Sequence, residues 1–313
     1  MKVIVGALVF ALLPAAALAA EFPEWAYPVA PQGLQRPDPN TVVTVPGSDK
    51  KYTEAQVNNA FGPPDWFPNE HAPLPKTVAE GRRPDVRACA LCHLTTGDGH
   101  PESSGIAGLP ANYIIRQLSE FKSGGRKGIR TGAMKGIASA INEDEAREAA
   151  AYFAARKPTP GYNKVVESAT VPKSYVGEGA MRFEAKDGGT EPIGNRIIVV
   201  PQNEEGAKAR NPHTGFVAYV PPGSVAKGQA LAATGGGKTL PCAICHGQGL
   251  TGIGEVPPLA NRDPMYLYRQ LNDMQAGMRN NPSMALMKAV VEKLTPDDML
   301  SLVAYAASLE PPK

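Results

Sequence analysis

The sequence has few aromatic residues and almost no excess of charge. Phe, Trp and Tyr make up 6% of its 313 residues, and 32 basic side chains stand against 30 acidic ones, a formal net charge of +2. A nucleic-acid-binding protein concentrates positive charge on one surface, so this balance argues against that class. Glycine (32) and proline (31) are frequent instead, which predicts small helical cores joined by many turns. A chain of this length is expected to form two domains.

Long hydrophobic runs are also missing, except for a short one at the start. Lys2 precedes an apolar run at residues 3–13, and the chain then reaches Ala17 and Ala19. A positive start, a short apolar core and small residues two positions apart are typical of a secretory signal peptide. The run is well short of the roughly 20 residues that cross a bilayer. We therefore expect residues 1–19 to be a cleaved signal peptide, and the mature protein to be periplasmic, soluble and not membrane-spanning.

Only four cysteines are present, and they form two identical C-x-x-C-H motifs. This motif is the attachment site of a c-type haem, because two thiols on one helical turn bond to the porphyrin vinyl groups and the adjacent histidine binds the iron. The sequence therefore predicts two covalently bound haem c groups. The predicted attachment residues are Cys89, Cys92, Cys242 and Cys245, and the predicted axial histidines are His93 and His246.

Three other roles compete for these cysteines. In an exported chain they could form two disulfides. A thioredoxin-like redox pair would need a strand before the motif and a βαβ pattern, and the sequence shows neither. A zinc site would need two further ligands, which a histidine directly after the second cysteine cannot supply. Two copies of the haem motif with no cysteine left over favour haem.

The sequence repeats itself at the offset that separates the two motifs, 153 residues from Cys89 to Cys242. The same offset aligns further residues without a gap. The aligned positions are Tyr113, Arg116, Gln117 and Leu118 with Tyr266, Arg269, Gln270 and Leu271; Gly124 and Arg126 with Gly277 and Arg279; and Tyr152 with Tyr305. The chain therefore contains two copies of one haem domain.

A pair of methionines obeys the same offset. Met134 and Met287 each lie 41 residues after the histidine of their motif. A methionine thioether is the second axial ligand that raises the potential of a His-ligated haem iron. We therefore predict Met134 and Met287 as the axial partners of the two histidines. Met284 is a rival to Met287, while the weaker candidates are histidines without a partner in the repeat: His71, His100 and His213.

The order of these motifs, followed by a final helix with A-Y-x-A, resembles that of tandem dihaem class I cytochromes c. The resemblance covers residues 77–157 and 222–309 and implies a mainly α fold with two class I domains in tandem. It also implies that a glycine on the first helix of each domain meets an aromatic residue on the last. The implied pairs are Gly228 with Tyr305 and Gly81 with Tyr152.

The first domain departs from the family pattern. Only seven residues separate Gly81 from Cys89, and Pro84 interrupts them. Proline disrupts a helix interior, so we expect the opening helix of this domain to be truncated, or replaced by residues 52–61.

The segments outside the repeat are rich in proline and glycine. We expect residues 20–50 to form an extended arm on the surface, or to be disordered. The first cytochrome domain should then span 51–157, an insert 158–221 and the second domain 222–313. A structureless insert of that length would be unusual. Two β-type runs in it, 196–200 and 216–220, predict a small hairpin with a polar tip at 202–214.

Several basic side chains allow two further hypotheses. Arg82 with Arg83, and Arg126 with Lys127, are candidates for steering an acidic redox partner, against the simpler interpretation of a solvated surface. Arg116 and Arg269 are candidates for pairing with haem propionates, against a salt bridge on a helix surface.

Two irons that each carry His and Met have no open position for substrate, and such a haem works by changing oxidation state. The sequence therefore predicts a periplasmic dihaem c-type cytochrome, not an enzyme, that transfers single electrons between a redox donor and an acceptor. One alternative is a cytochrome subunit of a larger dehydrogenase or oxidase, docked to a membrane or periplasmic redox complex. Another is a dihaem enzyme, such as a peroxidase, with one open haem. A cysteine ligand, as in thiosulfate dehydrogenases, is excluded because all four thiols are used.

Overall fold

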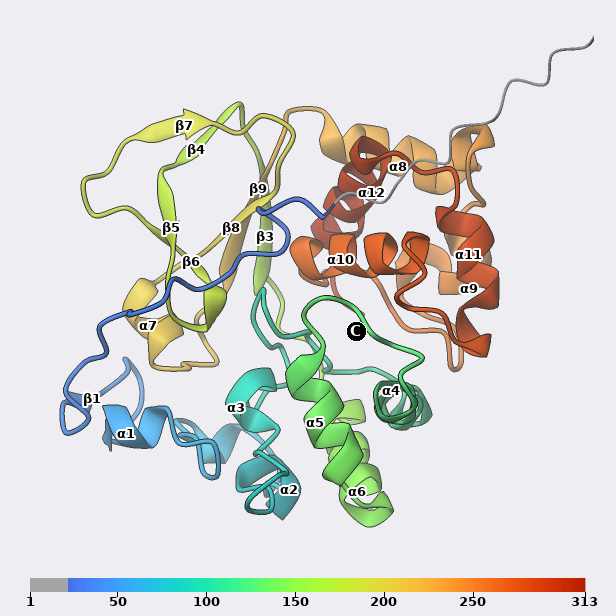
Figure 1. The fold of residues 1–313 in the computed structure, drawn as a ribbon. Coiled ribbons are helices and arrows are strands. Elements are labelled where there is room, and N and C mark those ends of the chain that lie inside the picture. The colour runs from blue at the N-terminus through green and yellow to red at the C-terminus, as the bar shows by residue number, and fades with distance from the viewer. Residues whose placement is uncertain (1–21, 313) are drawn as a thin grey trace, which may run out of the picture.

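The computed structural model describes residues 22–312, so the predicted signal peptide lies outside the described residues. Two helical units stand around a group of small sheets, and Figure 1 shows them at the bottom, upper right and upper left. We name them first domain, second domain and insert, keeping the predicted bounds. Among residues 22–312, no helix combines the length and apolarity needed to cross a bilayer.

The first domain is built on three longer helices with short elements before them. Its elements are β1 Val42–Val43, β2 Tyr52–Thr53, α1 Glu54–Val57, a 3-10 turn Pro68–Glu70, α2 Lys76–Ala79, α3 Ala90–His93, α4 Ala111–Ser123, α5 Gly132–Ala140 and α6 Glu143–Ala154. Helix α4 packs against both α5 and α6. At the start of α6, Asn142 and Glu145 form a capping box, in which each side chain bonds the other residue's backbone N–H.

The second domain repeats this order with a longer first helix. Its helices are α8 Ser224–Thr234, α9 Ala243–His246, α10 Pro264–Gln275, α11 Ala285–Val291 and α12 Pro296–Ser308, with 3-10 turns at Gly235–Gly237, Gln248–Leu250 and Pro282–Met284. Helix α12 starts with its own capping box, Thr295 with Asp298. It packs along α8 and against α10, and its buried face fills the core of this domain.

The glycine and aromatic pair of the second domain lies where the family resemblance implies. A methyl group on Gly228 would overlap the Ser301 carbonyl oxygen and approach Tyr305 Cβ to 2.9 Å. Helices α8 and α12 therefore cross at a point where only hydrogen fits.

The prediction that Gly81 meets Tyr152 in the first domain is wrong. Helix α2 is a single turn that ends at Ala79, so Gly81 lies in the following turn at φ 66° and faces the backbone of residues 86–88. Tyr152 instead donates its hydroxyl to the Thr95 carbonyl at 2.6 Å. The opening helix is truncated as expected. Residues 52–61 do not replace it, because β2 and α1 belong to a separate small core around Trp66.

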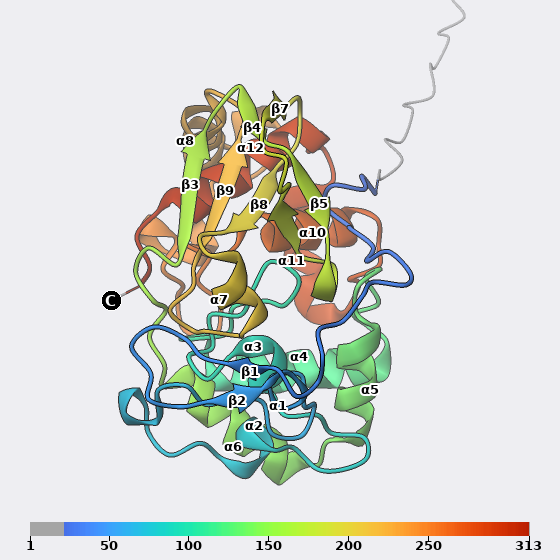
Figure 2. The same cartoon turned by 90° about the vertical axis from the view of Figure 1, so that its left-hand side faces the viewer.

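The insert is a small β structure packed on the second domain. Its elements are β3 Asn163–Glu167, β4 Thr170–Pro172, β5 Ser174–Val176, a 3-10 turn Glu178–Ala180, β6 Arg182–Glu184, β7 Thr190–Pro192, β8 Ile198–Pro201, α7 Glu204–Lys208 and β9 Phe216–Val220. The predicted hairpin is confirmed, since β8 pairs antiparallel with β9. Its expected polar tip contains α7, and β3 adds a parallel strand, giving the order β3-β9-β8 (Figure 2). Strands β4 with β7 and β5 with β6 form two further pairs.

The expectation of a surface arm at residues 20–50 is wrong for its first part. Ala26 is fully buried and Tyr27 is 6% exposed, and both join the core of the second domain. The Trp25 ring packs on Tyr268 at 4.6 Å between centroids, and Arg269 donates to the Ala26 carbonyl at 2.9 Å. Aromatic side chains drive this docking because they bury a large apolar area. Residues 31–42 are exposed, as expected of an arm.

Candidate haem-binding sites

Both C-x-x-C-H motifs form the same short helical turn. The first cysteine of each motif precedes a four-residue helix, α3 or α9, and has helical backbone angles itself, with φ −63° at Cys89 and −64° at Cys242. The two thiols of each motif are therefore one turn apart, as bonding to two vinyl groups requires. None of the four cysteines is in a disulfide. Within residues 22–312, three or more His, Cys, Asp or Glu side chains nowhere gather as a metal-binding group.

The two motif histidines have matching hydrogen bonds. His93 Nδ1 lies 2.8 Å from the Ser104 carbonyl oxygen, and His246 Nδ1 lies 2.9 Å from that of Pro257. A carbonyl can only accept, so Nδ1 carries the proton and Nε2 keeps its lone pair for a metal. Burial lowers the pKa of both histidines, which favours the neutral form that a ligand needs. Both imidazoles therefore suit an axial ligand.

The methionines of the repeat occupy equivalent places. Met134 is the third residue of α5 and Met287 the third residue of α11, and both are half-buried. Met287 packs against the core of the second domain. Its rival Met284 is also half-buried and ends the 3-10 turn before α11. The choice of Met134 and Met287 as ligands stays a prediction.

Two of the histidines without a repeat partner are engaged elsewhere. His71 Nε2 lies 3.0 Å from Asp65 Oδ1, and His213 Nε2 lies 2.7 Å from Glu70 Oε2. The His213 ring also stacks on Phe67 at 3.9 Å between centroids. These contacts give both side chains structural roles in the first domain and its border with the insert.

Two arginines related by the repeat meet between the domains. Arg126 and Arg279 form a backbone bridge, flanked by hydrogen bonds from Lys127 N to Met278 O and from Asn280 N to Gly125 O, both 2.9 Å. Their guanidinium groups are buried and donate to side-chain oxygens of α4 and α10. Those bonds are Arg126 to Gln117 (2.8 Å), Gln270 (2.8 Å) and Tyr266 (3.0 Å), and Arg279 to Gln117 (2.8 Å), Gln270 (3.1 Å) and Tyr113 (3.1 Å). We call these six residues the interdomain arginine cluster.

The comparisons with known proteins bear on both haem sites. No family model matches the chain. The thiosulfate dehydrogenase electron acceptor of Stutzerimonas stutzeri (strain A1501) is 27% identical over 73% of this chain and 82% of its own length. Cytochrome c4 of Stutzerimonas stutzeri is 22% identical over 74% of this chain and 89% of its own length. Cytochrome c-554(548) of Halomonas halodenitrificans is 30% identical over 23% of this chain and 88% of its own length. The chain belongs to the tandem dihaem class I cytochromes c.

This dihaem cytochrome is an electron-transfer protein with two covalently bound haem c groups, and the predicted fold class is confirmed. Its interdomain arginine cluster fits the propionates that each haem carries. Neither Arg126 nor Arg279 forms an ion pair with a carboxylate in the part of the chain that the structure describes, and Arg279 Nε has no hydrogen-bond partner there. Buried charges are normally paired, so this cluster suits an anion.

The pKa of Tyr266 reports the same excess of positive charge. Burial alone would raise the pKa of this phenol, but the nearby guanidinium groups of Arg126 and Arg279 outweigh it, and the pKa is lowered. The cluster is therefore electropositive, as a propionate site in the dihaem cytochrome should be.

Two hypotheses about basic residues need correction. Arg126 is 8% exposed, so it cannot steer a partner from the surface. Arg269 is not on a helix surface: it is buried, donates to the carbonyls of Ala26 and Pro101, and pairs with Glu102 at 3.7 Å. Its pairing with a haem propionate stays a prediction. Arg116 lies near the surface, where its Nη2 donates to the Glu255 carbonyl at 3.5 Å. The repeat did align every member of the arginine cluster, but it did not separate buried from exposed arginines.

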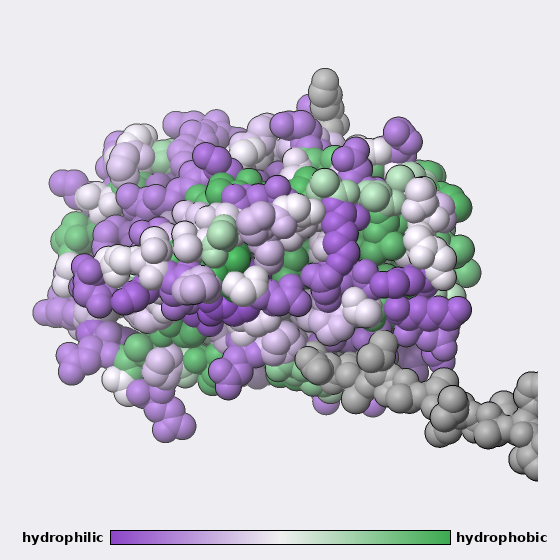
Figure 3. Space-filling view, turned by 90° about the horizontal axis from the view of Figure 1, so that it is seen from above, coloured by the Kyte–Doolittle hydropathy of each residue, from purple (hydrophilic) through white to green (hydrophobic). Residues whose placement is uncertain are grey.

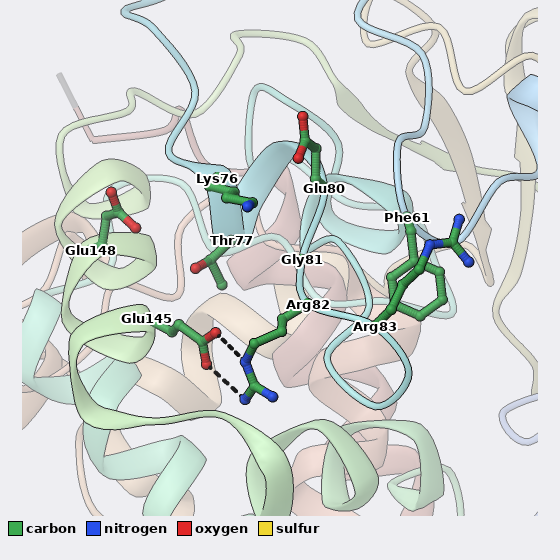
Figure 4. Close-up of a pocket in the computed structure, with 9 residues that line it drawn as sticks. All are labelled: Phe61, Lys76, Thr77, Glu80, Gly81, Arg82, Arg83, Glu145 and Glu148. Atoms are coloured by element: carbon green, nitrogen blue, oxygen red, sulfur yellow. Dashed lines mark hydrogen bonds and ion pairs between the residues drawn. The ribbon is translucent and has the colours of Figure 1, made fainter.

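A cavity of about 500 Å³ opens where the first domain lacks a long opening helix (Figure 4). Arg82 spans it and bonds both carboxylate oxygens of Glu145, at 2.7 and 3.2 Å, while Arg83 stacks on Phe61 at 4.4 Å. The second domain has a comparable ion pair, Lys238 with Asp298 at 2.7 Å. No cysteine or histidine lines the cavity, so it is not a haem site. Arg82 is held by this ion pair, which weakens its proposed role in steering.

The environment of His100 predicts a loss of stability in acid. Burial, with the charge of Arg210 adding to it, lowers the His100 pKa to about 3. An unfolded histidine titrates near 6.5, so between pH 6.5 and 3 the unfolded chain binds one more proton at this residue than the folded chain. Stability should therefore fall as pH drops through this window, by up to about 1.4 kcal/mol per pH unit.

Urea unfolding of the holoprotein between pH 7 and 4 measures this effect. His100→Gln should show a shallower decline than the wild type, because glutamine does not titrate. Equal slopes for His100→Gln and the wild type would show that His100 does not contribute.

Proposed function

We propose that this chain is a periplasmic cytochrome that passes single electrons between redox partners through two haems, each held by histidine and methionine. The observation that carries the proposal is the equivalence of the two sites: both histidines bond a carbonyl through Nδ1, and each methionine is the third residue of a helix at the same repeat position. The proposed covalent attachment residues are Cys89, Cys92, Cys242 and Cys245. The proposed axial ligands are His93 with Met134 and His246 with Met287.

Each bound haem supplies a one-electron couple, and the chain supplies its position and electrostatic surroundings. The two cysteines of a motif would fix the ring plane, and the Nδ1 hydrogen bonds hold each imidazole in one orientation and raise its basicity. The methionine thioether would close the sixth position and favour a high potential. Arg126 and Arg279 would hold propionates at the boundary where the two domains meet.

This arrangement favours electron transfer over catalysis. Two protein ligands on each iron leave no position for a substrate, so a peroxidase-like activity would require one methionine to leave. Export follows from the proposed signal peptide at residues 1–19, which also places the chain in the compartment where disulfide-forming conditions prevail.

A dehydrogenase is the class of partner that the relatives favour. One of them is described as an electron acceptor of thiosulfate dehydrogenase, and it aligns with most of both chains. The second site also has the more exposed attachment turn: Cys245 is exposed, Ile244 is 67% exposed and Leu240 is 53% exposed. In the first domain, Leu91 at the position of Ile244 is 8% exposed. Figure 3 shows hydrophobic residues in separate patches on the upper face, one of them on the side of the second domain. We therefore place partner docking at the second site.

Absorption spectroscopy of the purified holoprotein tests the closed-site proposal. The far-red band of methionine bound to ferric haem should amount to two equivalents per chain, and the reduced protein should not bind carbon monoxide. One equivalent of the band, with carbon monoxide bound at the other haem, would contradict the proposal and favour an enzyme with one open haem.

A further inference from the structure

The insert reaches the attachment turn of the first haem through one side chain. Arg210 follows α7 and donates from Nη1 to the carbonyl of Leu91 at 2.7 Å. Leu91 stands between the two cysteines of the first motif. The same guanidinium donates from Nε to the Val57 carbonyl at 3.0 Å and from Nη2 to Asn58 Oδ1 at 3.2 Å. Arg210 thus joins the insert, the attachment turn and the segment before it.

Backbone geometry shows that this contact is held in place. Arg210 has φ 56°, in the left-handed region that side-chain-bearing residues rarely adopt and that persists only where the surroundings fix it. Leu94, directly after His93, has φ 61°, whereas the repeat places Gly247, at φ 79°, in the second domain. The buried Leu94 side chain joins the core cluster that contains Tyr162 and Phe216 of the insert. The insert therefore contacts the first attachment turn at Leu91, between the cysteines, and at Leu94, directly after the histidine.

The charge that Arg210 brings has no direct ion-pair partner among residues 22–312. Its three acceptors are two carbonyl oxygens and one amide oxygen, and within residues 22–312 no carboxylate lies at ion-pair distance from it. An arginine stays protonated in proteins. Burial lowers its pKa, while Cys92 and the carboxylate of Glu178 act in the opposite direction. The side chain therefore holds a full positive charge beside the turn to which the first haem would be bonded.

The second domain has no such charge at the equivalent turn. The residue matching Leu91 is Ile244, which is 67% exposed to solvent. No charged side chain of the described chain donates to its carbonyl. The two haem sites, equivalent in their proposed ligands, thus differ in one buried cation.

We propose that Arg210 raises the redox potential of the first haem relative to the second. The inference rests on the proposed attachment and ligation of the haems. An electron delivered by the redox partner adds one negative charge at the site, and neither a proton nor any atom moves with it. A positive charge held in a medium of low dielectric constant stabilises that added charge. Through Arg210, the insert therefore makes the first haem a better electron acceptor than it would be without this charge.

Potentiometric titration of holoprotein variants tests the proposal, with Cys245→Ala as a spectral label in every variant. Cys245 is exposed and belongs to the second site, so its loss leaves one vinyl group on that haem and moves its absorption band away from that of the first. Arg210→Gln should lower the midpoint of the first haem by about tenfold in equilibrium constant, or 59 mV. The midpoint of the second haem should stay unchanged.

Three further variants distinguish an effect of the Arg210 charge on the first midpoint from an effect of altered structure. Arg210→Lys keeps the charge and should keep most of the potential. Lys208→Gln removes the same charge from the same segment, but Lys208 faces Glu204 at 2.6 Å, so the first midpoint should not move. Asn58→Asp places a carboxylate next to the Arg210 guanidinium without removing it, and should lower the first midpoint even if Arg210→Gln folds poorly.

The proposal is overturned if Asn58→Asp and a folded Arg210→Gln leave the first midpoint unchanged, or if Lys208→Gln shifts it as much. Failure of the underlying site assignment looks different. In that case Cys245→Ala would not split the two absorption bands, whatever Arg210 does.

Discussion

Met134→Ala is expected to remove one of two equivalents of the far-red methionine-to-haem band and to lower the midpoint of the first haem. Alanine cannot replace the thioether as a ligand, and the loss of methionine favours the oxidised iron. The shift should be on the order of 0.1 V or more, within the roughly 0.8 V range that axial ligands span. The reduced variant should bind carbon monoxide at one haem, because its sixth position is open.

The second site offers a matched set of variants. Met287→Ala should reproduce the same changes at the second haem, and a double variant should lose the band completely. Met284→Ala is the control, since Met284 lies three residues before Met287 and is also half-buried. If Met284→Ala removes the band and Met287→Ala does not, Met284 is the ligand.

Gly228→Ala is expected to destabilise the second domain by about 3 kcal/mol or more. The added methyl group would overlap the backbone carbonyl of Ser301 at the crossing of α8 and α12, and neither helix backbone can move aside without disturbing the core. Urea unfolding of the holoprotein, followed by circular dichroism, measures the change. The midpoint of the second haem should shift as well, because α8 leads into the second attachment motif.

Gly136→Ala provides the control for helix propensity. Gly136 lies inside α5, and a methyl group there would meet no atom within 4 Å. This variant should gain up to about 1 kcal/mol, because alanine favours the helix more than glycine does. A Gly228→Ala protein as stable as the wild type would show that α8 and α12 are less closely packed than described.

The sequence was sufficient for the parts of the molecule that local chemistry defines. C-x-x-C-H is a motif of five consecutive residues, and α3 and α9 each place it on a short helix. The 153-residue offset then located α4 with α10 and α6 with α12. Short-range patterns of this kind can be recognised in the sequence because hydrogen bonds along a helix link residues that are close together in the chain.

Contacts between distant segments were not predictable in the same way. Arg126 follows a glycine at a helix end and looks like a surface residue, yet Arg279 and Gln270 of the second domain bury it. The resemblance matches Gly81 with Gly228 in spite of its short spacing to the motif, but a one-turn α2 ends before it, so Gly81 is not on a helix. The Arg210 contact spans 119 residues to Leu91. Each depends on which surfaces meet, and single-sequence patterns carry no such information.

The docked arm makes the second domain depend on the start of the chain. Tyr27 donates to Asp273 at 3.1 Å and accepts from Asn272 at 3.1 Å, so one of the earliest described residues completes the core of the domain made last. That core cannot close until α10 and the start of the chain can contact each other. A second domain produced alone from residue 222 would lack Trp25, Ala26 and Tyr27 and would expose the apolar surface that they cover. The second haem domain is therefore not separable from the start of the chain by a cut at residue 222.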